Sequence, residues 1–365
     1  MPFTDRSSAA ARLGQALDGR FRLDEVLESD VLAHTYLASD SAAERAVVSI
    51  LQAELGGAPS IASHFVRGAH VASMIGRGVP AVRDAGLTPD GFPFVVFERV
   101  ARETLHAFLL RRRGRIAPME GLRIAAAALD VLGAAHDRAL FHGELSPRRI
   151  LLDELGNVYV SGFGWGKLRE RAAAHFGLAC VPNTAAYFSP EQARTRAASE
   201  SGDVWAVAAI LFELLSGRPL REATTEEKRL SDAASRPAPS LAFLNAQAPG
   251  ELVALLERAL DLNAARRFNS AIAFSRACTL VAGLPNPWFW QQESRPRFAP
   301  TEPALAVPGS ASLPLRDPPP RTSIVAPRPG SVVPPGKAQA VGDSARHYVA
   351  PTPTDMPPRP PPRSR

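Results

Sequence analysis

The chain has 365 residues, 45% of them hydrophobic, which is enough for a two-lobed body plus a tail. The formal net charge is +6, but the segment after Leu284 carries 10 basic and 5 acidic residues. The remainder is therefore nearly neutral, which argues against a nucleic-acid groove across it. The two cysteines, Cys180 and Cys278, lie far apart, which argues against a disulfide framework or a zinc site and favours a reducing compartment.

No apolar stretch has the length of a membrane span. The longest, Val204 to Leu215, is too short for a bilayer and is interrupted by Glu213. The first residues, MPFTDRSSAA, lack the apolar region of a signal peptide. We therefore expect a cytoplasmic protein without a membrane span.

Several elements can be predicted in chain order from apolar spacing and turn residues. Strand-like sequence begins at residues 19–23, and residues 45–51 (RAVVSIL) have the composition of a buried strand. Residues 61–75 carry apolar side chains at helical spacing, and residues 119–139 predict a long helix rich in Ala and Leu. Two short strands follow at 150–152 and 158–160, joined by a hairpin turn at 154–157.

The loops beside this last pair of strands carry the most informative residues. Residues 140–153 read LFHGELSPRRILLD, and residues 161–164 read SGFG, so both loops would lie at one sheet edge. Together they resemble the bacterial Ser/Thr protein kinases, which have H-R-D-L-K-P-x-N-I-L-L-D, a hairpin, and then D-F-G. The scaffold residues of these motifs are present: His142, Leu145, Pro147, Ile150, Leu151, Leu152, Asp153, Phe163 and Gly164.

The resemblance covers about residues 19–283 and includes three further motifs. Residues 183–191 are similar to G-T-P-x-Y-M-S-P-E, residues 201–206 to S-D-x-W-A, and residues 263–268 to D-P-x-x-R-F. The resemblance implies that Asp203 holds the backbone of the loop around His142. It also implies that Glu191 and Arg267 form a buried ion pair, and that His142 and Phe163 are structural.

The implied fold is α+β and bilobal, a protein kinase-like fold with an antiparallel-sheet small lobe and a larger helical lobe. The lobes are expected at residues 19–100 and 101–284, preceded by a flexible arm at 1–18. Residues 285–365 hold 21 of the 34 prolines and are expected to be a disordered, basic, Pro-rich tail.

Two features near the tail leave alternatives open. The PPPR at 318–321 and the PPRPPPR at 357–363 resemble ligands of aromatic-groove modules, and a solvated spacer is the alternative. The aromatic run at 288–290 (WFW) would cap the large lobe or dock a partner.

The positions that perform phosphoryl transfer in the family hold other residues here. The base Asp is Glu144, and the Lys that steadies the transferred group is Ser146. The two magnesium ligands, Asn and the D-F-G Asp, are Arg149 and Gly162. Losing both ligands and the Lys removes most of the charge stabilisation that the reaction needs.

The nucleotide-binding positions of the small lobe are altered as well. The glycine-rich loop is replaced by residues 28–33 (ESDVLA), which have no glycine and two carboxylates that would repel phosphate. Ser49, interpreted as a surface serine, stands at the position of the phosphate-gripping Lys, and Gly68 at that of its Glu partner. Phe97, at the gatekeeper position, is equally plausible as a core aromatic. Together with Ser49 and Glu98 it would line a remnant nucleotide cleft.

The segment between the two motifs lacks the parts of a phosphorylation switch. No Ser, Thr or Tyr lies between Gly164 and Thr184, and Gly143 replaces the Arg that would receive a phosphate. Cys180 in this segment is either a reactive thiol or an inert loop cysteine.

The sequence therefore predicts a catalytically inactive pseudokinase that acts as a signalling scaffold or binding module. The alternative is a weakly active Ser/Thr kinase that binds ATP and uses Glu144 as base, with Lys167 or Arg149 as substitute cation. A third hypothesis is a nucleotide-gated switch without turnover. No cofactor and no metal are expected, and any ATP would bind weakly. The expected partners are proteins, such as an active kinase or its substrate, and not nucleic acid.

Overall fold

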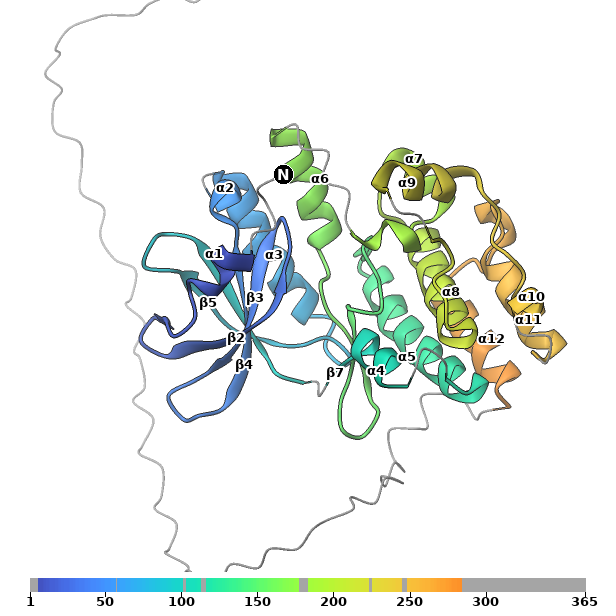
Figure 1. Ribbon diagram of the computed structural model, residues 1–365, viewed down its shortest axis with the longest axis horizontal. Coiled ribbons are helices and arrows are strands. Elements are labelled where there is room, and N and C mark those ends of the chain that lie inside the picture. The colour runs from blue at the N-terminus through green and yellow to red at the C-terminus, as the bar shows by residue number, and fades with distance from the viewer. Residues whose placement is uncertain are drawn as a thin grey trace, which may run out of the picture. The chain divides into compact units, whose positions relative to one another are not determined.

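The computed structural model describes residues 6–283, except 57, 101–102, 113–115, 177–182, 223–224 and 245–247. The described residues form a sheet lobe followed by a helical lobe, as predicted (Figure 1). The expected tail, the aromatic run at 288–290 and Cys180 lie outside the described residues. The lobe boundaries at 100 and 284 stay predictions.

The small lobe is built on a six-stranded antiparallel sheet. Its spatial order is β1 (Ala16–Leu17), β2 (Phe21–Ser29), β3 (Ala33–Ser39), β4 (Arg45–Leu51), β6 (Pro93–Glu98) and β5 (Val82–Leu87). Two helices, α2 (Ala53–Gly56) and α3 (Pro59–Ser73), follow β4. The predicted helix at 61–75 is therefore present, and its buried residues Ile61, Phe65, Ala69 and Ala72 recur at helical spacing.

The first residues differ from the flexible arm predicted over 1–18. Residues Arg6–Ala10 form α1, and β1 pairs with β2. Ala9 and Leu17 are fully buried, and the hydroxyl of Tyr36 donates to the carbonyl of Ala9 at 3.1 Å. Ala9 and Leu17 thus join the apolar cluster on one face of the sheet, and two buried side chains leave no periodic signal in such a short, polar segment.

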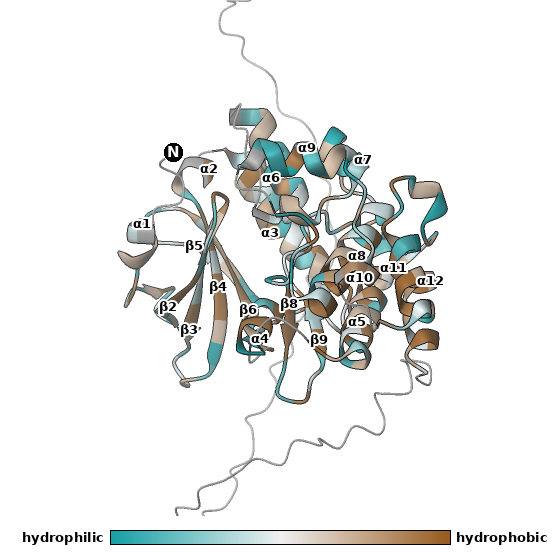
Figure 2. Ribbon diagram, turned by 45° about the vertical axis from the view of Figure 1, so that its right-hand side comes forward, coloured by the Kyte–Doolittle hydropathy of each residue, from teal (hydrophilic) through white to brown (hydrophobic). Residues whose placement is uncertain are grey.

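The helical lobe surrounds one long buried helix, α8 (Glu200–Ser216). It begins at Ser199, whose side chain accepts from the backbone N–H of Gly202, and ends at Gly217 in the left-handed conformation. α5 (Pro118–His136) and α12 (Ala271–Val281) pack with it in one hydrophobic core, the brown interior of Figure 2. The remaining helices of this lobe are α4 (Leu105–Arg111), α7 (Pro190–Thr195), α9 (Glu226–Ser235), α10 (Leu241–Leu244) and α11 (Gly250–Ala259). Two 3₁₀ turns complete it, η1 (Asn183–Tyr187) and η2 (Ala264–Arg266).

A second, three-stranded sheet positions the two motif loops. Its order is β7 (Glu103–Thr104), β8 (Ile150–Leu152) and β9 (Val158–Val160), with β8 and β9 as the predicted hairpin. The helix α6 (Trp165–Phe176) begins directly after the second motif loop and lies beside α3. No helix among the described residues has the length and hydrophobicity needed to span a bilayer.

Candidate functional site

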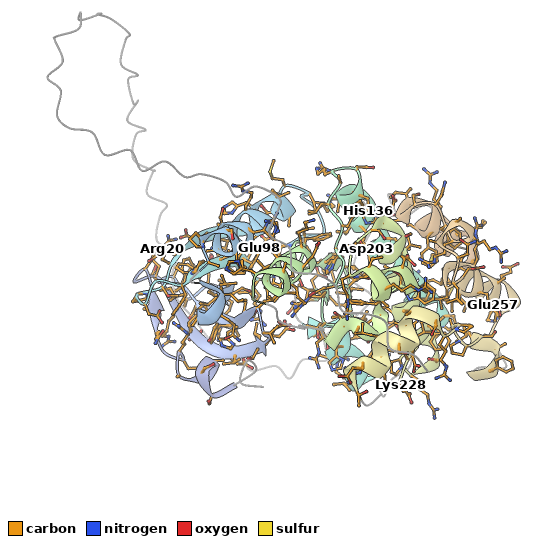
Figure 3. The ribbon with its side chains drawn as sticks, turned by 90° about the horizontal axis from the view of Figure 1, so that it is seen from above. Arg20, Glu98, His136, Asp203, Lys228 and Glu257 are labelled. Atoms are coloured by element: carbon orange, nitrogen blue, oxygen red, sulfur yellow. The ribbon has the colours of Figure 1, made fainter. Side chains whose placement is uncertain are left out.

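Asp203 on α8 forms hydrogen bonds with the backbone of the loop that carries Glu144. Its carboxylate accepts from the backbone N–H of His142 at 2.8 Å and from that of Gly143 at 2.9 Å. The Nε2 atom of His136 lies 2.9 Å from the same carboxylate, and Figure 3 shows these two side chains together in the helical lobe. Asp203 is fully buried, so its bonds satisfy a charge that would otherwise be costly. The structure thus contains the anchoring contact that the resemblance implies.

His142 joins the two motif loops to each other. Its Nε2 lies 2.9 Å from the carbonyl of Ser161, so Nε2 carries the proton, and Nδ1 accepts from the backbone N–H of Glu144. Burial lowers the pKa of His142, which keeps the ring neutral in this tautomer. The ring also packs against Phe163 at 4.9 Å between centroids. His142 therefore has a structural role in the described geometry.

A second support is the bidentate ion pair of Glu191 and Arg267. The two guanidinium nitrogens lie 2.7 and 2.8 Å from the carboxylate oxygens. Arg267 also donates to the carbonyls of Ser201 and Asp261 and stacks over the ring of Trp205. The pair implied by the resemblance is thus present, and the arginine connects it to the backbone around it.

Arg149 occupies the space next to Gly162, the other altered metal position. A Cβ atom at Gly162 would lie 2.9 Å from Cδ of Arg149, and Gly162 has φ +85°. The guanidinium then reaches the carboxylate of Glu28 on β2 at 2.9 Å and lies over the ring of Trp165. One cation, only 8% exposed, therefore stands where two oxygen ligands would be needed to hold a magnesium ion.

Glu144 is paired with an arginine that the sequence analysis did not single out. Arg169 on α6 contacts both carboxylate oxygens of Glu144 and donates to both oxygens of Asp30 at 3.0 Å. Burial raises the pKa of Glu144, and the adjacent guanidinium opposes that rise. Glu144 is 3% exposed and Arg169 is 5% exposed. Both oxygens of this buried carboxylate are therefore engaged by one guanidinium.

Glu28, Asp30, Glu144, Arg149 and Arg169 together form a network that we call the cleft ion-pair network. Two of its carboxylates, Glu28 at the end of β2 and Asp30 in the turn to β3, lie where the family has a glycine-rich loop. We expected them only to repel phosphate, whereas in the structure they neutralise the two arginines. The end of β2 and the turn are thereby joined to the first motif loop through Arg149 and to α6 through Arg169.

The apolar face of α6 places Arg169 in this network. Trp165, Leu168 and Ala172 are buried in one cluster with Phe65 of α3 and Leu51 of β4. Their spacing of three and four residues is helical, and this was the signal from which α6 could have been predicted. The partner of Arg169 could not be read from that spacing.

Of the three residues expected to line a remnant nucleotide cleft, Ser49 and Phe97 lie on the same face of the neighbouring strands β4 and β6, because Ser49 pairs with Val95 and Val47 with Phe97. Ser49 is 3% exposed, not a surface serine, and its hydroxyl lies 3.0 Å from that of Thr35 on the neighbouring strand. Phe97 is partly buried against the apolar cluster that contains Phe65, as the core-aromatic interpretation expects. Glu98, the next residue, points to the opposite face because side chains alternate along a strand, and it accepts from the backbone N–H of Ala81.

Three further residues that the sequence suggested as site positions are not part of the cleft ion-pair network. Lys167, offered as a substitute cation, is 59% exposed and pairs outward with Glu170 at 3.7 Å, away from Glu144. Ser146 is buried, and its carbonyl accepts from the backbone N–H of Arg149. Gly68 lies on α3 in close contact with Gly164. Within the described ranges, no group of three or more His, Cys, Asp or Glu side chains is placed to hold a metal ion.

Comparison with known proteins agrees with this geometry. A family profile described as "Protein kinase domain" matches residues 85–277. The serine/threonine-protein kinase PknB of Mycolicibacterium smegmatis is 33% identical over 211 residues, which are 56% of this chain and 34% of PknB. PrkC of Bacillus subtilis is 30% identical over 209 residues, 56% of this chain and 32% of PrkC. The chain thus matches about a third of the length of these relatives.

A solved structure supports the fold. The Mycobacterium tuberculosis PknI kinase domain has a TM-score of 0.57 and 21% identity, with 74% of this chain and 98% of that chain covered. At this identity the likeness concerns the arrangement of the elements alone.

Proposed function

Because this chain belongs to the protein kinase family, with bacterial Ser/Thr kinases among its relatives, we propose that it is a pseudokinase that binds protein partners and does not transfer phosphate. The observation that carries the proposal is the cleft ion-pair network. Every described charged side chain at the altered catalytic positions has its partner within this chain.

The first supporting argument concerns the metal. Magnesium requires a nearly octahedral set of oxygen ligands, and phosphoryl transfer depends on it for charge neutralisation. Gly162 supplies no ligand, and the guanidinium of Arg149 lies beside it. A cation at this position repels a divalent ion, so Mg-ATP loses the interaction that normally anchors its phosphates.

The second argument concerns the base. A general base must be within hydrogen-bond reach of the attacking hydroxyl and have an accessible lone pair. Both oxygens of Glu144 contact Arg169, and the residue is buried. Freeing Glu144 for catalysis would leave the buried guanidinium with Asp30 alone, which is energetically unfavourable.

The third argument is that the supports of the helical lobe are complete. Asp203 bonds the loop backbone, and Arg267 pairs with Glu191. Groups that stabilise the fold are retained, while groups that would contact nucleotide are replaced or form ion pairs with other side chains of the chain. This distribution favours a role as a folded binding surface, with an active kinase or its substrate as the proposed kind of partner.

Thermal unfolding of the full chain in the presence of ATP tests the proposal. We expect no increase in Tm with ATP and magnesium together, because a ligand stabilises only the state that binds it. In parallel, radiolabelled ATP and a generic protein substrate should yield no labelled product. Phosphate transfer that disappears in a Glu144→Gln variant would instead establish the weakly active kinase. Stabilisation by ATP without magnesium, with no transfer, would establish the nucleotide-gated switch.

A further inference from the structure

Basic side chains gather on the neighbouring helices α3 and α6. We call this surface the α3–α6 face and define it by His64, Arg67, Lys167 and Arg171. The two helices pack together through a shared apolar cluster and lie side by side in both ribbon views (Figures 1 and 2).

The packing of two glycines brings these four side chains together. A Cβ atom at Gly164 would lie only 3.4 Å from the Cα atom of Gly68, so the start of α6 crosses α3 at close range. His64 lies one turn before Gly68, and Lys167 and Arg171 lie one and two turns after Gly164. Burial and then the charges of Arg171, Lys167 and Arg67 lower the pKa of His64.

Most of this positive charge is not neutralised locally. Arg67 and Arg171 are exposed, and within the described part of the chain neither has an ion pair. The carboxylate of Glu170 lies 3.7 Å from Lys167, so the face keeps a net positive charge. Like charges held close together cost free energy, and within the described fold no ion pair offsets this cost at Arg67 or Arg171.

Exposed apolar side chains continue the face along α3. Val71 and Met74 follow Arg67 by one and two turns, and they are 39% and 73% exposed. An exposed Met next to cations suits a partner that has both acidic and apolar side chains. Residues 285–365 of this chain do not match that description, because they carry 10 basic and 5 acidic residues.

We propose that the α3–α6 face is a docking surface for an acidic protein segment that also carries an apolar anchor. The inference deepens the proposed binding role and rests on it for its biological purpose. The acidic side chains would pair with Arg67 and Arg171, and the apolar side chain would lie on Val71 and Met74.

Binding of a labelled peptide to the full chain tests this proposal. The probe is a fluorescein-labelled peptide of repeated Glu-Glu-Leu units, and the comparison is between wild type and an Arg67→Glu/Arg171→Glu variant. We expect affinity to fall about tenfold, since two exposed ion pairs are lost. A Val71→Ser/Met74→Ser variant should weaken binding about threefold, with the charge unchanged.

The matched control reverses the charge at two exposed arginines of the helical lobe, in an Arg266→Glu/Arg276→Glu variant. It makes the same change in net charge and leaves residues 285–365 intact, so equal weakening in this variant would overturn the proposal. So would unchanged peptide affinity in the Arg67→Glu/Arg171→Glu variant. If that variant does not fold, Arg67→Gln/Arg171→Gln takes its place under the same criteria.

The last measurement is binding of the chain to vesicles of phosphatidylglycerol. If they bind wild type through Arg67 and Arg171 while the peptide does not, a lipid surface replaces the protein segment and the proposal fails. Phosphate transfer by the chain would refute the pseudokinase assignment without changing these binding results. Loss of the peptide site would leave the pseudokinase assignment intact.

Discussion

Two arginine–carboxylate clusters of this molecule have similar geometry and different consequences. Arg267 pairs with Glu191 inside the helical lobe, and Arg169 pairs with Glu144 and Asp30 between the lobes. Arg267 also donates to backbone carbonyls, so it holds chain segments that the fold needs. Arg169 bonds carboxylates only, Glu144 at the position of the family's base and Asp30 in the β2–β3 turn. The same chemistry therefore supports the helical lobe in one place and joins the two lobes in the other.

The largest effect is expected from breaking the pair inside the helical lobe. Arg267→Met should lower the free energy of unfolding by about 4 kcal/mol, because it leaves a carboxylate and several carbonyls without their donor. Urea unfolding at neutral pH measures this, with Arg266→Met as the exposed neighbouring control, expected within about 0.5 kcal/mol of wild type. A Glu191→Gln/Arg267→Met double variant should stay destabilised, since the carbonyls remain unpaired.

The pH dependence of this pair has a defined sign. Burial alone would raise the pKa of Glu191, but the hydrogen bonds from Arg267 lower it from 4.5 to about 2. A depressed folded-state pKa contributes stability above the ordinary value and loses it as the pH falls. The destabilisation by Arg267→Met should therefore shrink between about pH 4.5 and pH 2. A cost that does not change with pH would mean that the charge of Glu191 contributes nothing.

An intermediate effect is expected from the cluster between the lobes. Arg169→Met should cost about 3 kcal/mol at pH 7, because Glu144 is left buried without its cation. A Glu144→Gln/Arg169→Met double variant should recover to within about 1 kcal/mol of wild type, unlike the corresponding double variant of the other cluster. Lys167→Met, on the outer side of the same helix, serves as the matched control.

The two clusters should also differ in how pH acts on their single variants. Without Arg169, the raised pKa of Glu144 rises further, and a raised folded-state pKa loses stability as the pH increases through it. The cost of Arg169→Met should therefore grow between about pH 4.5 and about pH 8, whereas the cost of Arg267→Met changes in the same direction but at lower pH, between about pH 2 and about pH 4.5. An equal cost at both pH values would contradict the assignment of a buried, ionised Glu144.

The smallest effect is expected from Gly162→Ala, which tests how closely the side chain of Arg149 packs against Gly162. The left-handed backbone and the contact with Arg149 should together cost about 2 kcal/mol. Gly156 also has a left-handed backbone (φ +81°), but a Cβ atom added there would meet no atom within 4 Å. Gly156→Ala should therefore show only the cost of the left-handed backbone, about 1 kcal/mol. A double-mutant cycle with Arg149→Ala should recover the difference, and additivity would show that Arg149 does not fill this space.

The supports of the fold could be predicted because each lies in a recognisable motif. The positions of Asp203, Glu191 and Arg267 within their motifs implied their contacts, and the structure contains them. The helix at 61–75 and the hairpin at 150–160 followed from apolar spacing in the same way. The packed segment at 6–17 was missed, because its two buried apolar side chains, Ala9 and Leu17, give no periodic pattern.

The sequence by itself determined that the kinase scaffold is present and that the ligands for phosphate and metal are replaced. These statements depend on residue types at fixed positions within motifs. Tertiary structure alone decided what takes their place. Glu28 and Arg149 are 121 residues apart, and Asp30 and Arg169 are 139 residues apart, so no local pattern connects them. Burial of the apolar side of α6 brings Arg169 to Asp30, and Trp165 at the start of the same helix lies beneath the guanidinium of Arg149.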